Sequence, residues 1–124
     1  MVWKGVIVEE SMIDASLFDM VTEVGYSENL IEDEGEKGAM HSHEFELQDE
    51  KKDSFVAAAK KLVKQGWYLH LCQNGTMIVI FNDRCFEFNE NEDDKIRAAE
   101  RHGVSIGIPP EHVNFTEMIR NPFY

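Results

Sequence analysis

The clearest hydrophobic pattern in the chain is the apolar stretch from residue 67 to residue 88. Two runs rich in β-branched and aromatic residues, 67–73 and 76–81, flank Asn74-Gly75. This pair favours a two-residue type I′ hairpin. A second tight turn at Asn82-Asp83 leads into a third run, 85–88. These spacings predict a three-stranded antiparallel meander.

Alternation along the predicted meander makes both of its faces apolar. If both turns contain two residues, one face carries these side chains: Tyr68, His70, Cys72, Met77, Val79, Phe81, Phe86 and Phe88. The other face carries Leu69, Leu71, Ile78, Ile80 and Cys85. We expect helices on one face, and the N-terminal segments or a second subunit on the other. A homodimer is therefore one expectation.

The N-terminal half is predicted to alternate strand and helix. Residues 2–8 are β-branched and aromatic, which favours a strand. Apolar residues at helical spacing predict a helix from Ser11 to Gly25. Residues 26–37 are acidic with little periodicity and are predicted to form a loop. The alternation over residues 39–48 predicts a half-buried strand.

The remaining segments predict helices. One begins at Asp49 or Asp53 and ends at Gly66, and another covers 91–102, with a short helical segment over 111–120. We therefore predict a single domain, 1–124, of the α+β class. Its sheet is mostly antiparallel with about five strands, and two or three helices pack mainly on one face. The predicted order is β-α-β-α-β-β-β-α.

Charge narrows the possible partners. The 124 residues include 24 acidic and 12 basic side chains, for a net charge of −12. Phosphate backbones and anionic lipid are bound through Lys and Arg, so we expect neither direct nucleic-acid binding nor a membrane partner. No apolar run reaches the length of a membrane span, and the N-terminus lacks a signal-peptide pattern, which favours a cytoplasmic location. The two cysteines are expected to be free thiols.

The stretch 66–115 carries a recognisable pair of motifs. Gly66–His70 reads glycine-aromatic-tyrosine-x-histidine, and Gly103–Pro109 reads glycine-x-serine-x-glycine-isoleucine-proline. In these motifs the chain resembles a family of small uncharacterised prokaryotic proteins with no known activity. The resemblance implies an α+β fold and transfers no catalytic residue.

Three histidines are the candidate metal ligands. His41 and His43 lie two positions apart on one predicted strand, so their side chains share a face about 6–7 Å apart. His70 would complete a site if the sheet brought its strand beside theirs, with Tyr68 nearby on the same face. The alternative is that these histidines lie at the core edge and hydrogen-bond to backbone or water.

Cysteine and serine motifs point less clearly to chemistry. Cys72 shares a strand face with His70, but its apolar neighbours predict a buried, unreactive thiol, and we expect both cysteines to react slowly. The Gly103–Gly107 segment has the spacing of a nucleophile elbow, yet it follows a predicted helix instead of a strand. We interpret it as a shaped loop.

The leading functional hypothesis is a non-enzymatic binding or protein-interaction module without a cofactor. Between Ser54 and Asn82 the only formally charged side chains are those of Lys60, Lys61 and Lys64. They either form an ordinary solvated face or bind an acidic protein partner. Together with Tyr68 and His70 they are the candidate binding residues. The alternatives are a metal-binding protein or enzyme that uses the three histidines, and an acidic nucleic-acid mimic.

Overall fold

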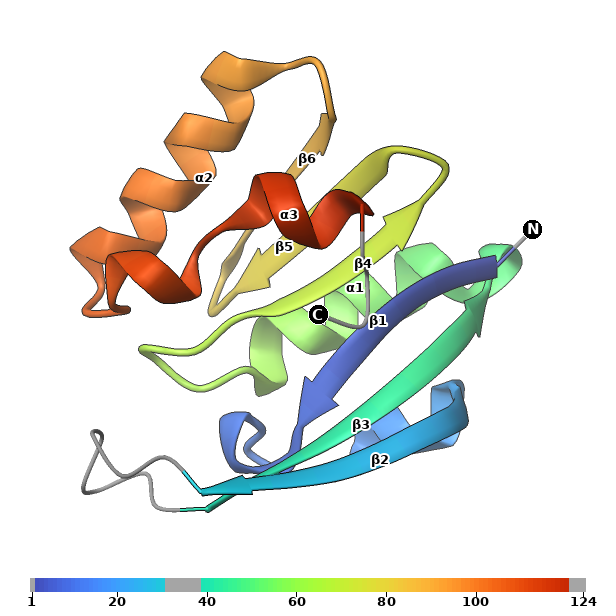
Figure 1. Ribbon diagram of the computed structural model, residues 1–124. Coiled ribbons are helices and arrows are strands. Elements are labelled where there is room, and N and C mark those ends of the chain that lie inside the picture. Colours follow the sequence, from blue (N-terminus) through green and yellow to red (C-terminus); the bar gives the residue numbers. More distant parts are fainter. Residues whose placement is uncertain (1, 31–38, 121–124) are drawn as a thin grey trace.

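The fold is a six-stranded, fully antiparallel sheet with helices on both faces (Figure 1). The computed structural model describes residues 2–30 and 39–120. The strands are β1 (Val2–Val8), β2 (Thr22–Leu30), β3 (Ala39–Gln48), β4 (Leu69–Gln73), β5 (Thr76–Phe81) and β6 (Arg84–Asn89). The α-helices are α1 (Lys52–Leu62), α2 (Asp93–Ser105) and α3 (Phe115–Arg120). Short 3-10 turns are η1 (Glu9–Ser11), η2 (Ser16–Met20), η4 (Asp49–Lys51) and η5 (Pro110–His112). The spatial order is β2-β3-β1-β4-β5-β6, so the α+β prediction is confirmed with one strand more than expected.

The predicted meander is confirmed in its register and in its first turn. His70 pairs with Val79 and Val79 pairs with Phe86. Asn74 and Gly75 both have positive φ, 47° and 79°, as a type I′ turn requires. Glycine tolerates this conformation without steric cost, which is why the Asn-Gly pair is informative in a sequence.

Each face of the sheet has its own core. On one face α1 and the η1–η2 segment cover buried residues that include Trp3, Phe45, Leu69 and Ile80. On the other face α2 and α3 cover a second cluster that includes Val79. In Figure 1 α1 lies behind the sheet, while α2 and α3 lie in front of β4, β5 and β6.

This arrangement corrects two expectations. The helices do not pack mainly on one face, because α1 lies on the face opposite α2 and α3. The second apolar face of the meander is covered by helices of the same chain, so the homodimer prediction loses the reason given for it. Among the described residues, no helix is both long and apolar enough to cross a membrane.

The predicted helix from Ser11 to Gly25 is wrong. The one helical turn that forms within this range is η2, where Leu17 is buried at 1% exposure. From Thr22 the chain becomes β2, which extends through part of the predicted acidic loop; the rest of that loop, 31–37, lies outside the described residues. Pairing with β3 satisfies the backbone groups of this segment, and this tertiary contact outweighs the helical spacing.

Candidate functional site

Two glutamates and two histidines meet where β1 ends, on the face of the sheet that carries α1. Antiparallel pairing sets Ile7 beside His43 and Val8 beside Ser42, so η1, which follows β1 directly, lies over the first half of β3. Glu9 and Glu10 in η1 thereby reach the histidines of β3, although more than thirty residues separate them in sequence.

The η1 turn is held in place by backbone hydrogen bonds to the end of α1. The Ser11 carbonyl accepts from the Lys64 N–H at 2.8 Å, and the Ile13 N–H donates to the Leu62 carbonyl at 2.7 Å. The Ser11 hydroxyl, on a residue only 1% exposed, donates to the Val8 carbonyl at 2.7 Å. Ser11 therefore fixes the turn that presents the two glutamates, instead of starting a helix.

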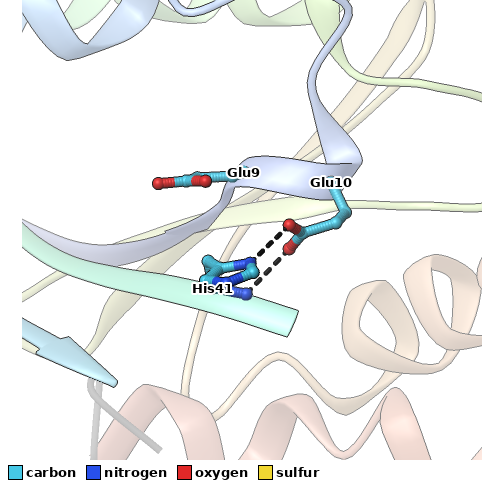
Figure 2. A group of neighbouring side chains, drawn as sticks. All are labelled: Glu9, Glu10 and His41. Carbon is cyan, nitrogen blue, oxygen red and sulfur yellow. Dashed lines mark hydrogen bonds and ion pairs between the residues drawn. The ribbon is translucent and has the colours of Figure 1, made fainter. Parts of the chain in front are cut away.

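Glu10 binds His41 through both oxygens of its carboxylate. Oε1 accepts the His41 backbone N–H and Oε2 contacts the His41 Nδ1, each at 2.7 Å. Figure 2 shows these two contacts, with Glu9 extending from the same turn. Desolvation raises the pKa of Glu10, but the hydrogen bonds from His41 outweigh it and hold the pKa below the ordinary value. Glu10 is therefore a fixed carboxylate anion at neutral pH.

A β-bulge adds Glu23 to the same face. Glu23 pairs with Phe45, the register then shifts between Glu23 and Gly25, and Tyr26 pairs with His43. On a regular strand, Glu23 and Tyr26 would point to opposite faces, because they are three positions apart. The extra residue of the bulge puts both side chains on the same face, so Glu23 and Tyr26 both lie beside His43.

His43 lies between two carboxylates. Its Nε2 contacts Glu9 Oε1 at 2.5 Å, and its Nδ1 contacts Glu23 Oε1. Burial lowers the pKa of His43, but the hydrogen bonds and negative charges of Glu23 and Glu9 outweigh this effect and raise it above the ordinary value. The Tyr26 and Phe18 rings lie against the imidazole, with centroids at 4.9 and 4.8 Å. His43 thus holds Glu9 and Glu23 in place through its two ring nitrogens.

Glu9, Glu10 and His41 are close enough together that each could offer one ligand atom to a metal ion. One ligand atom from each residue lies within 4.8 Å of the other two. A metal with bonds of about 2.1 Å bridges donors up to about 4.2 Å apart, so small side-chain movements would close the site. The side chains of His41 and Glu10 are 31% and 30% exposed, and that of Glu9 is 46% exposed, which leaves access from solvent.

The structure does not bring His70 to His41 and His43. His43 pairs with Ile7 of β1, whereas His70 pairs with the preceding residue of β1, Val6. Neighbouring residues of a strand point to opposite faces, so His70 faces the α2–α3 side and the other two histidines face the α1 side. The predicted three-histidine site is therefore wrong, while His41 and His43 do share a face as predicted.

The other candidate binding residues are also separated. Tyr68 lies under α3, where its hydroxyl contacts the His112 carbonyl and the Met118 sulfur. His70, at 5% exposure, is buried on that side. Lys60 and Lys61 lie in the last turn of α1 and Lys64 just after it, and no ion pair among the described residues includes these three. These residues do not form one site.

The two cysteines differ from each other. Cys72 is buried, and desolvation raises the pKa of its thiol to about 12. Its Sγ contacts the Met118 carbonyl at 3.5 Å. Cys85 is exposed on β6, so the expectation that both thiols are sheltered is wrong for Cys85. An edge strand leaves this side chain open to solvent, although its face is apolar further along the sheet.

Sequence reasoning missed Glu9, Glu10 and Glu23. Glu9 and Glu10, which directly follow the first apolar strand, were a visible signal of a candidate site. The end of a strand is a place where side chains can approach those of a neighbouring strand. Nothing in the sequence showed that β1 pairs with β3, or that a bulge in β2 redirects Glu23.

Comparisons with family models, curated proteins and solved structures find no match to this chain. The family resemblance of residues 66–115 therefore stays a prediction, and the case for function rests on the geometry of the glutamates and histidines.

Proposed function

We propose that this chain is a binding protein for a divalent transition-metal ion, held by Glu9, Glu10 and His41. The observation that carries the proposal is the convergence of one imidazole and two carboxylates from two separate elements, with all three ligand atoms within 4.8 Å of one another. This proposal keeps the metal-binding alternative and replaces two of its three ligands.

Local charge supports a cation at this place. Glu9, Glu10 and Glu23 are neutralised only by His41 and His43 in the ion pairs among the described residues. Three carboxylates and two imidazoles have a net charge of −1 even when both rings are protonated. A divalent ion supplies the missing positive charge, and it can replace the proton that His41 shares with Glu10.

The donor set favours a particular class of metal. Imidazole suits zinc, copper, iron and nickel, whereas Mg²⁺ and Ca²⁺ prefer sites built from oxygen alone. Three protein ligands leave at least one coordination position for water or a small ligand. His43 is bonded to Glu9 and would orient that carboxylate toward the ion, as hydrogen-bonded neighbours do at metal sites.

Isothermal titration calorimetry on chelator-treated protein without an affinity tag tests the proposal. Zn²⁺ and Ni²⁺ should each bind at one site per chain, more tightly than Mg²⁺ or Ca²⁺. His41→Gln and Glu10→Gln should each weaken binding at least tenfold, because each removes a ligand. Melting curves would confirm that both variants fold.

His102→Gln and Glu46→Gln are the matched controls. Each makes the same chemical change outside the cluster, on α2 and on the opposite face of β3. Neither should change the affinity for Zn²⁺. If no metal binds, or if the two cluster variants bind as tightly as the controls, the proposal is wrong.

A further inference from the structure

A hollow beside the proposed metal site combines apolar and acidic lining residues. It has a volume of about 650 Å³, which is within the range of small-molecule sites. Its apolar floor includes Met12, Phe18 and Val21, which belong to the core on the α1 face. Its polar walls are Glu9, Asp14 and Glu23, together with His43.

The polar side chains that line this hollow include carboxylate oxygens that could accept hydrogen bonds from a cation. Glu9 and Glu23 each contact His43 through one carboxylate oxygen, Oε1. Their second oxygens have no hydrogen bond among the described residues, and their side chains are 46% and 50% exposed. Among the described residues that line the hollow there are three acidic side chains, one imidazole, and neither Lys nor Arg.

We propose that this hollow binds a small organic cation: an ammonium or guanidinium group attached to an apolar body. The cationic group would lie between the free oxygens of Glu9 and Glu23, where charge-assisted hydrogen bonds are strong. The apolar body would rest on Met12 and Phe18, and the Phe18 ring would add a cation–π contribution. The chain's net charge of −12 would also concentrate cations near the protein.

This site is independent of the metal except at Glu9, which belongs to both. Glu10 and His41 are metal ligands outside the hollow, whereas Glu23 and Phe18 line the hollow and are not metal ligands. Variants can therefore separate the two proposals. Glu10→Gln should leave cation binding intact, and Glu23→Gln should weaken cation binding without removing a metal ligand.

The test is an NMR titration of the metal-free, ¹⁵N-labelled chain with three probes of one shape: benzylammonium, benzyl alcohol and benzoate. Benzylammonium should cause saturable shifts at the amides of Phe18, Val21 and Glu23. Benzyl alcohol should bind at least tenfold more weakly, since it keeps the ring and loses the charge. Benzoate should not bind.

Variants complete the test. Glu23→Gln and Asp14→Asn should each weaken benzylammonium binding severalfold, while Glu46→Gln, with the same loss of charge on the opposite face of the sheet, should not. Asp14 is included because Glu23→Gln also removes a partner of His43. Equal binding of benzylammonium and benzyl alcohol would overturn the proposal, as would shifts centred elsewhere, such as at the Arg97–Arg101 groove between α2 and α3.

Discussion

The substitution Gly5→Ala should destabilise the protein strongly, because β1 and β4 approach each other closely at this position. A Cβ added to Gly5 would lie 2.1 Å from the backbone carbonyl oxygen of His70. It would also lie 3.0 Å from the Phe45 ring. Ordinary carbon–oxygen contacts are about 3.3 Å or longer, so the two strands would have to separate by about 1 Å.

This separation disturbs a short ladder. β1 pairs with β4 at only three positions, and Gly5 is the middle one, opposite Leu71. Losing about two backbone hydrogen bonds at about 1 kcal/mol each, with about 1–3 kcal/mol of overpacking, gives a loss of roughly 3–5 kcal/mol. For a chain of 124 residues, this loss lowers the melting temperature by roughly 10–20 °C.

Gly25→Ala is the matched control. The Cβ at Gly25 would lie 2.9 Å from Oε2 of Glu44, the far end of a flexible side chain that can rotate away. We expect a loss below about 1 kcal/mol, since alanine also reduces the entropy of the unfolded chain. Urea unfolding followed by tryptophan fluorescence measures both free energies of unfolding. Losses equal within about 1 kcal/mol would refute the close-approach reasoning.

Two further predictions concern titratable side chains. Cys85 should react with a thiol reagent rapidly in the folded protein, because it is exposed, whereas Cys72 should react only on unfolding, because burial raises its pKa to about 12. Mass spectrometry of each labelled peptide would show the order of reaction. Fast labelling of Cys72 in the native protein would contradict the prediction. Desolvation and the positive charge of Arg84 lower the pKa of His102 below its ordinary value of 6.5, so the unfolded state takes up the proton first as pH falls. The stability that His102 contributes is therefore complete above pH 6.5 and is lost as pH falls from there through the lower pKa of the folded state. Urea unfolding at several pH values should show that the free energy of unfolding of His102→Gln lacks this part of the decline. The same pH dependence in variant and parent would contradict the prediction.

The sequence was most informative where structure depends on neighbours in the chain. The meander register followed from Asn74-Gly75 and strict alternation, and the face shared by His41 and His43 followed from their spacing within β3. Such features are set by turn chemistry and by the two-residue period of a strand. They need no knowledge of which strands pair across the sheet.

The candidate site depends on long-range pairing, which is why most of it was missed. Glu10 reaches His41 only because the central strand β1 pairs with β3, and Glu23 reaches His43 only through the bulge in β2. The same central position of β1 separates His70 from the other histidines, since adjacent residues of β1 pair with them on opposite faces. Local patterns contain no information on strand order.

Anomalous X-ray diffraction at the zinc edge, from crystals of the chain soaked in Zn²⁺, tests the metal proposal most directly. We predict a peak about 2.0–2.2 Å from one ring nitrogen of His41 and from a carboxylate oxygen of each of Glu9 and Glu10. The peak should disappear in His41→Gln crystals. Zinc bound only elsewhere on the protein, or a peak at this corner that persists without the imidazole, would contradict the metal proposal.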